Sequence, residues 1–282
     1  MKNLNYPGGR DAVLLVHGLC SSPLEMQYLG RQLSKAGLAV FIPHLAGYGC
    51  IPGESDVRIG RWEDWHAQVA RHFDALKLHY RNVSLCGLCI GADLCLSLAA
   101  ERDNEVAAQA LLSTILFYDG WNISPFRALL PLAYHSPLRR FYPRYRERSP
   151  YGLKNERLRK WVEQEMKQQS QSSVGAAAIP TTALYQAELL IGHVKRLLPR
   201  VTAPTLLIHA KDDDVASVRS PDYVAARINA RVVRQCRLAD SYHMVTVDNE
   251  KEVVARRTIG FFREILGDIP SVRLGLAGTS FA

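Results

Sequence analysis

The stretch Val83–Asp93 reads Val-Ser-Leu-Cys-Gly-Leu-Cys-Ile-Gly-Ala-Asp and joins an apolar, strand-like run to a segment with helical character. Cys89 stands between Gly87 and Gly91, in the G-x-C-x-G form of the turn that presents a nucleophile between a strand and a helix. Glycines lack Cβ, so strand and helix can pass close together there. The turn also directs the amide N–H of Ile90 toward the space above Cys89. We therefore predict a nucleophilic Cys89, with a buried structural cysteine as the alternative.

The composition outside this turn is typical of a globular protein. The chain has 282 residues, of which 48% are hydrophobic and 22% charged, enough for one large α/β domain or two small ones. The first residues form no apolar signal core, and no apolar run is long enough to span a bilayer. We therefore expect a cytoplasmic protein without a transmembrane segment.

The six cysteines need not form disulfides in an intracellular chain. Cys86 and Cys89 have the spacing of a redox C-x-x-C pair, but Cys86 belongs to the strand and Cys89 to the turn, so they occupy different kinds of site. No second Cys/His pair stands at ligand spacing, which disfavours a metal site. We expect neither a metal nor a cofactor.

Much of the net charge of +8 lies in the middle of the chain. It is either a solvated face or a basic patch for an anionic partner, such as coenzyme A, an acyl carrier protein or a phospholipid surface. Nucleic acid is not expected, because no binding motif accompanies the charge. The basic residues are Arg139, Arg140, Arg144, Arg146, Arg148, Lys154, Arg157, Arg159 and Lys160.

Strand-like and helix-like segments alternate along most of the chain, which predicts a mostly parallel sheet covered by helices on both faces. In such sheets, ligands lie beyond the carboxyl ends of the strands. Besides the run that enters Gly87, the predicted strands are 12–16, 38–42, 108–112, 205–210 and 231–238. The predicted helices are 24–36, 61–80, 92–100, 155–169, 182–198 and 250–266.

The regular alternation of strand-like and helix-like segments stops between residues 116 and 204, where the chain is rich in aromatic and basic residues and contains several prolines. We interpret 116–204 as an insertion that forms a cap or lid over a binding site, with an extra helical layer without a gating role as the alternative. Residues 1–115 and 205–270 then form the core, and 271–282 form a C-terminal tail without a functional signal.

Three kinds of side chain follow the strands in the order nucleophile, acid, base. Cys89 comes first, an aspartate follows the penultimate strand, and His243 follows the last strand. A free thiol has a pKa of about 8.5, so an imidazole must draw off its proton, and a carboxylate must orient that imidazole. Spacing alone does not choose among Asp212–Asp214, and Asp119 also follows a strand end.

The attacked carbonyl group also needs two donors where negative charge develops, and losing one typically costs roughly 2.7–4 kcal/mol. The amide of Ile90 is the first candidate. The amide of Leu19, after His17 and Gly18 at the end of another strand, is the second. Ser113 also follows a strand end, so we expect His17, Cys89 and Ser113 to converge.

Taken together, these motifs resemble the α/β-hydrolases of the monoacylglycerol lipase and bacterial carboxylesterase type. The resemblance covers nearly the whole chain except the insertion and the tail. It is carried by the segments 13–19, 47–49, 62–65, 87–91, 207–213 and 241–248.

The resemblance implies the α/β-hydrolase fold, with a helical cap inserted after the sixth strand. In that family the acid stands third after the small residue that closes the strand, here Ala210, which implies Asp213. The oxyanion donors of the family match the amides of Leu19 and Ile90. The family uses serine where this chain has Cys89. Two other α/β-hydrolase groups, dienelactone hydrolases and polyhydroxyalkanoate synthases, carry G-x-C-x-G.

We therefore expect an acyl hydrolase for small-molecule carboxylic esters, lactones or thioesters, acting through an acyl-cysteine intermediate. In this scheme Cys89 is the nucleophile, His243 the base and then the acid, and Asp213 the residue that orients it. One alternative is an acyltransferase that uses a coenzyme A or carrier-bound donor. Another is a weakly catalytic member of the fold that binds a small ligand.

Overall fold

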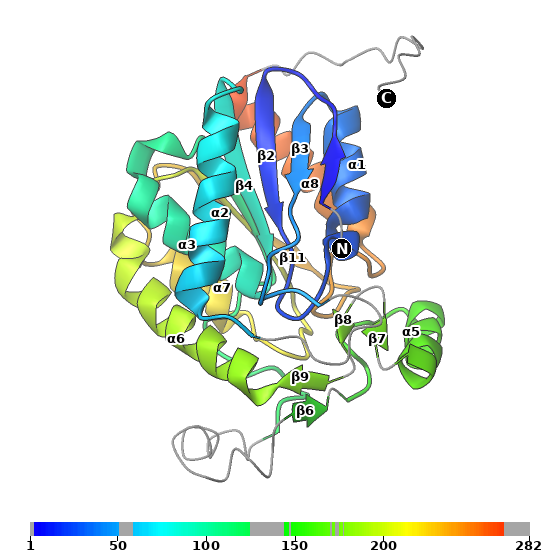
Figure 1. Ribbon diagram of the computed structural model, residues 1–282. Helices are drawn as coiled ribbons and strands as arrows, with labels where there is room; N and C mark the ends of the chain where they lie inside the picture. Colours follow the sequence, from blue (N-terminus) through cyan, green and yellow to red (C-terminus); the bar gives the residue numbers. More distant parts are fainter. Residues whose placement is uncertain are drawn as a thin grey trace.

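The computed structural model describes residues 3–50, 59–124, 144–146, 148–169, 171–172, 175–176 and 178–267. Within these residues a seven-stranded sheet forms the centre (Figure 1). β1 runs antiparallel to its neighbour and all other pairs are parallel, which confirms the mostly parallel sheet. Across the sheet lie β1 (Leu4–Tyr6), β3 (Ala39–Ile42), β2 (Asp11–Val16), β4 (Asn82–Leu88), β5 (Gln109–Leu112), β10 (Thr205–Ala210) and β11 (Val233–Leu238).

Helices cover both faces of the sheet because its inner strands are apolar on both sides. In β2, Val13 and Leu15 pack with residues of α1 and α8, whereas Leu14 and Val16 pack with residues of α2, α3 and α6. Figure 1 shows these two helical layers on opposite sides of the sheet. The helices are α1 (Gln27–Lys35), α2 (Trp62–Lys77), α3 (Ile90–Arg102), α5 (Glu156–Gln169), α6 (Thr181–Leu197), α7 (Arg219–Ala225) and α8 (Lys251–Leu266).

The predicted insertion enters after β5, which is the fifth strand of the described chain and not the sixth. A single short strand, β1, precedes the parallel strands, so the count is one lower than the resemblance implied. The described insertion holds α5, α6 and two small antiparallel pairs. These are β6 (Arg144–Arg146) with β9 (Ala178–Pro180), and β7 (Gln171–Ser172) with β8 (Gly175–Ala176).

α6 lies along α3 in the helical layer over the sheet. Its residues Ala187, Leu190 and Val194 are buried in the same apolar cluster as α2 and α3. The division of the chain into a core and a cap at 116–204 stays a prediction. The tail 271–282 and basic residues Arg139 and Arg140 lie outside the described residues.

The expected helices and strands are present, and the structure adds elements that the sequence patterns did not indicate, among them β1, α7 and the short strands β6 to β9. The edge strand β1 has only three residues, and the short helix α7 contains Pro221, which is typical of loops. No helix of the described chain is long and apolar enough to cross a membrane.

Candidate active site

Cys89 occupies the sharp turn between β4 and α3, in a backbone conformation that L-residues rarely adopt. Its φ is 60° and its ψ is −128°. Such strained conformations cost roughly 1–3 kcal/mol and cluster at functional sites. Hydrogen bonds hold the turn, because the Cys89 amide donates to the carbonyl of Leu112 (2.9 Å) and the Ala92 amide donates to the carbonyl of Cys89 (3.0 Å). The half-buried thiol is thereby presented at the carboxyl end of the sheet.

The two glycines around Cys89 stand where backbones meet too closely for a side chain. A Cβ on Gly87 would lie 2.3 Å from the carbonyl oxygen of Gly91. A Cβ on Gly91 would lie 2.5 Å from the carbonyl oxygens of both Val16 and His17. The glycines therefore let β4, α3 and the end of β2 come together at the turn.

Replacing Gly91 with alanine should destabilise the protein by about 3 kcal/mol, because backbone atoms surround the position and cannot rotate away. Gly260→Ala is the matched control, since this glycine lies in α8 and a Cβ there would meet nothing within 4 Å. The control should stabilise the protein by about 1 kcal/mol through helix propensity. Urea unfolding of both variants measures the two effects. Equal stability of the variants would contradict this account of the turn.

His243 and Asp213 meet at the carboxyl ends of β11 and β10. Nδ1 of His243 lies 2.9 Å and 3.0 Å from the two carboxylate oxygens of Asp213, and both side chains are buried. Burial by itself raises the pKa of Asp213, yet the charge and hydrogen bond of His243 hold it below its ordinary value. Asp213 is therefore ionised, and its carboxylate accepts a hydrogen bond from Nδ1–H of His243.

The side chain of Cys89 lies close enough to His243 to act on the charge of its ring. Burial lowers the pKa of His243, but the charges of Asp213 and Cys89 and its side-chain contacts with both raise it well above its ordinary value. Nε2 has no hydrogen bond of regular geometry within the described residues, so its contact with Cys89 is loose. Loose nucleophile–base contacts are common in active sites without substrate.

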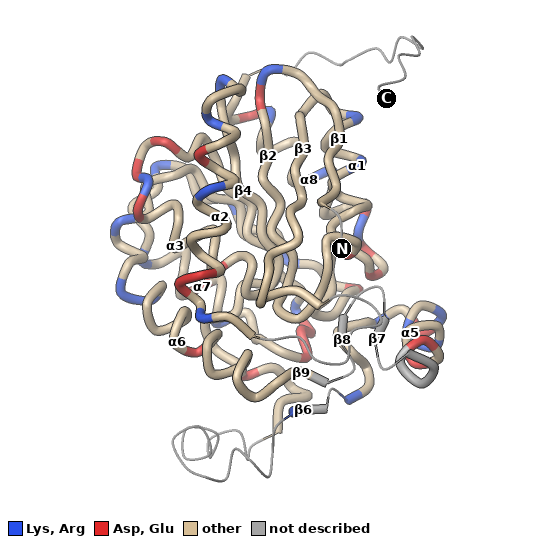
Figure 2. Tube along the Cα trace, viewed as in Figure 1, with Lys and Arg blue, Asp and Glu red and all other residues tan. Residues whose placement is uncertain are grey.

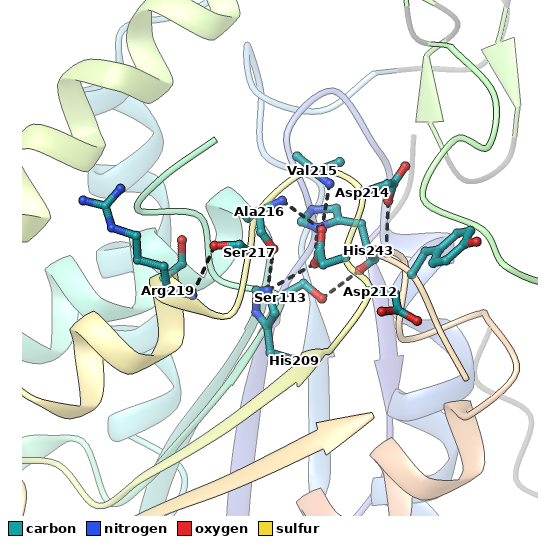
Figure 3. A network of polar contacts seen from close by, with 12 residues as sticks. Ser113, His209, Asp212, Asp214, Val215, Ala216, Ser217, Arg219 and His243 are labelled. Atoms are coloured by element: carbon teal, nitrogen blue, oxygen red, sulfur yellow. Dashed lines mark hydrogen bonds and ion pairs between the residues drawn. The ribbon is translucent and has the colours of Figure 1, made fainter. Parts of the chain in front are cut away.

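The structure separates the four carboxylates that the sequence left open. Asp212 is exposed and lies 3.6 Å from the Lys154 ammonium group. Asp119 accepts a hydrogen bond from the amide of Ser217 (2.9 Å). Asp214 binds the backbone amide of His243 at 3.3 Å, away from the imidazole ring (Figure 3). Asp213 is thus the carboxylate of the four that contacts the ring.

The amides of Leu19 and Ile90 have no hydrogen-bond acceptor among the described residues. The Leu19 loop lies against the nucleophile, since a Cβ on Gly18 would be 3.5 Å from Cβ of Cys89. Glu25 binds this loop by accepting hydrogen bonds from the amide of Gly18 and from Ser21 Oγ. Two unsatisfied N–H groups beside Cys89 can bind an oxyanion.

The loop is also held from its other side. The hydroxyl of Tyr48 donates to the carbonyl of His17 at 2.8 Å, and the two rings are in contact. Burial lowers the pKa of His17 to about 4, so its imidazole is neutral. These contacts fit the structural role expected for His17 from its place at the strand exit.

Two buried side chains support the imidazole and its carboxylate: Ser113, which the sequence placed near the site because it follows a strand end, and His209, which the sequence did not single out. Ser113 Oγ donates to the carbonyl of His243 at 2.8 Å (Figure 3). His209 Nε2 lies 2.7 Å from the carbonyl oxygen of Ala216 and 3.3 Å from Asp213 Oδ2. Burial lowers the pKa of His209, so this second imidazole is neutral. Its position at a strand end, four residues before Asp213, was the available signal.

None of the six cysteines, all within the described residues, forms a disulfide. Cys86 is buried in β4, where burial raises the pKa of its thiol, so it is not a redox partner placed beside Cys89 at the turn. No three His, Cys, Asp or Glu side chains of the described chain are arranged to hold a metal ion.

The strand order, the turn after β4 and the polar loops after β10 and β11 define the α/β-hydrolase fold. The family described as "Serine aminopeptidase, S33" matches residues 8–252. The chain therefore belongs to this family.

Proteins similar over nearly their whole length include two enzymes from Bacillus. A thermostable monoacylglycerol lipase of Bacillus sp. (strain H-257) is 25% identical over 259 residues, which cover 92% of this chain and 93% of that protein. A carboxylesterase of Bacillus subtilis (strain 168) is 24% identical over 270 residues, which cover 94% of this chain and 97% of that protein.

Solved structures share the fold. A structure from work on the metagenome-derived lipolytic enzymes LipS and LipT superposes with a TM-score of 0.77 at 24% identity, covering 93% of this chain and 97% of that chain. The monoacylglycerol lipase of Paleococcus ferrophilus superposes with a TM-score of 0.75 at 17% identity, and the match covers 93% of this chain and 98% of that chain.

Proposed function

We propose that the protein is a carboxylic-ester hydrolase that forms a covalent acyl intermediate on Cys89. The observation that carries this proposal is the imidazole of His243, which lies between the ionised carboxylate of Asp213 and the thiol at the strained turn. Membership of a hydrolase family and similarity to a lipase and a carboxylesterase support it.

The geometry supports a two-step reaction. His243 takes the proton of Cys89, and the thiolate attacks the ester carbonyl carbon while the amides of Leu19 and Ile90 stabilise the oxyanion. His243 then gives its proton to the leaving alcohol, and an acyl thioester remains on Cys89. In the second step His243 deprotonates a water molecule, which attacks the thioester. The carboxylic acid leaves and the thiol is restored.

The proposed substrates are small esters, lactones or thioesters with an apolar acyl part, and the proposed reaction uses no cofactor. The cap role of residues 116–204 and a cytoplasmic location belong to this proposal. The acyltransferase alternative depended on a basic insertion that recruits coenzyme A or an acyl carrier protein. In the described insertion, α5 contains both acidic and basic residues (Figure 2), so it is not a uniformly basic segment and gives that alternative no support.

The proposal is tested with short p-nitrophenyl esters and intact-mass measurement. We expect steady release of p-nitrophenol and, in samples quenched with acid during turnover, an added acyl mass on the peptide that contains Cys89. Cys89→Ala should show neither the adduct nor turnover, because no other nucleophile stands at the turn. An adduct that is released by an added alcohol or amine and not by water would instead indicate acyl transfer. Absence of any adduct with every ester would favour a ligand-binding role.

A further inference from the structure

Asp248 is a buried carboxylate that binds two separate parts of the chain. Its side chain accepts a hydrogen bond from the amide of Tyr242, the neighbour of His243, at 2.8 Å. It also accepts hydrogen bonds from the amides of Lys154 and Asn155, both at 2.9 Å. Lys154 and Asn155 belong to the predicted insertion and directly precede α5. One side chain thus joins the loop of the proposed base to the insertion.

The same two segments are joined again on the other side of His243. The amide of Gly152 donates to Asp214 Oδ2 at 3.1 Å, and Asp214 Oδ1 accepts from the amide of His243. The carbonyl of Gly152 accepts from the amide of Met244 at 2.9 Å. The turn at residues 151–155 therefore binds the backbone of Met244 directly, and it is linked to the backbone of Tyr242 through Asp248 and to that of His243 through Asp214.

The contact between this turn and His243 is also tight. Gly152 has a φ of 72°, and a Cβ there would lie 2.7 Å from Met244 Cγ and 3.2 Å from His243 Cβ. Asp248 is only 2% exposed, and hydrogen bonds to a buried carboxylate are stronger than those between neutral groups. Removing the carboxylate would leave three backbone N–H groups without their acceptor.

We propose that Asp248 is a positioning residue that holds His243 in place by binding the His243 loop and the turn at residues 151–155 with one carboxylate, so that the turn and His243 move together. The inference rests on the proposed function, in which His243 is the base. It also implies that a displacement of the insertion at this turn displaces the base. A misplacement of about 1 Å can lower a rate by roughly 100-fold.

The test compares Asp248→Asn with Asp240→Asn. The asparagine keeps the size of the side chain but turns an NH₂ group toward backbone donors. The control Asp240 is an exposed aspartate on the same loop whose side chain contacts other side chains, Lys154 and Asn249. We expect Asp248→Asn to lower kcat for a p-nitrophenyl ester about 10- to 100-fold with KM within about threefold. Asp240→Asn should stay within twofold of the parent.

Alkylation of Cys89 by iodoacetamide provides a readout that does not depend on ester turnover. Its rate–pH profile should shift in Asp248→Asn and not in Asp240→Asn, because the imidazole no longer lies at the thiol. If the parent hydrolyses no ester but this shift is seen, the proposed function fails and the positioning role stands. Parent-like kcat and a parent-like alkylation profile in folded Asp248→Asn would overturn the positioning role.

Gly152→Ala tests the same coupling from the insertion side and decides the matter if Asp248→Asn does not fold. The added Cβ presses on His243 and Met244 without changing Asp248. We expect slower alkylation of Cys89 and a lower kcat in this variant. Rates equal to those of the parent would show that the turn and His243 are not coupled.

Discussion

Replacing His243 with alanine is expected to lower kcat/KM for ester hydrolysis by about 10⁴-fold or more, as when the base of a hydrolytic triad is removed. The physical reason is that His243 moves a proton in each half of the proposed reaction. Its ring is oriented by Asp213 at 2.9 Å, whereas the other imidazole near Asp213, that of His209, is bound to the carbonyl of Ala216. Initial rates with p-nitrophenyl esters measure the loss.

The same variant should also alkylate more slowly at Cys89. In the proposed mechanism the imidazole takes the proton of the thiol, so its loss can slow the reaction of Cys89 with iodoacetamide by roughly 10- to 30-fold. His79→Ala, at an exposed position after α2, is the matched control and should react like the parent. Equal alkylation rates in His243→Ala and the parent would rule out a functional pair between the thiol and the imidazole.

The fold was predictable where burial dictates the residue types. The segment 12–16 is a continuous apolar run and 206–208 is apolar, and both belong to strands buried on both faces. β1 is an edge strand of three residues whose pairing with β3 no local pattern indicates. α7 is short and owes its position to contacts such as that of Ser220 Oγ, which accepts from the amide of Leu116, 104 residues earlier.

The candidate site was predictable to the extent that its chemistry has a local signature. Cys89 stands in a turn that needs glycines at fixed positions, and His243 stands in the loop after the last strand. The place of Ser113 after a strand end indicated that it lies near the site, but the contacts that hold His243 come from remote segments, so spacing could not specify them. Ser113 and His243 are 130 residues apart in the chain, and Asp248 and Asn155 are 93 apart.

The three consecutive aspartates provide a direct test of the acid. Asp213→Asn is expected to lower kcat about 10⁴-fold, because an amide in this place favours the wrong tautomer of His243. Asp212→Asn should stay within twofold, since Asp212 is exposed and contacts Lys154. In Asp214→Asn, kcat should fall about tenfold, because the carboxylate of Asp214 binds the backbone of His243 and not the ring. Equal losses in all three variants would contradict the assignment of Asp213.

Asp213 should also leave a signature in the pH dependence of stability. Although burial alone would raise its pKa, His243 holds the pKa of Asp213 in the folded protein below the ordinary value of about 3.9. The ionised carboxylate therefore stabilises the fold above about pH 4, and this contribution is lost as the pH falls through the lowered pKa. Asp213→Asn lacks the contribution. The gap in the free energy of unfolding between parent and variant should consequently narrow on acidification below about pH 4.

The alkaline end of the pH range tests His243, the partner of Asp213. The pKa of His243 is raised above its ordinary value of about 6.5, so its contribution is present below that pH and is lost as the pH rises through the raised pKa. In Asp213→Asn the largest favourable charge near the ring is gone. The difference in the free energy of unfolding between parent and variant should therefore also narrow as the pH rises through the raised pKa. Urea unfolding from pH 3 to pH 10 should show the largest difference in unfolding free energy between parent and variant at pH values between the lowered pKa of Asp213 and the raised pKa of His243. A gap that widens toward either extreme would mean that the carboxylate and the imidazole do not form an ion pair in the folded protein.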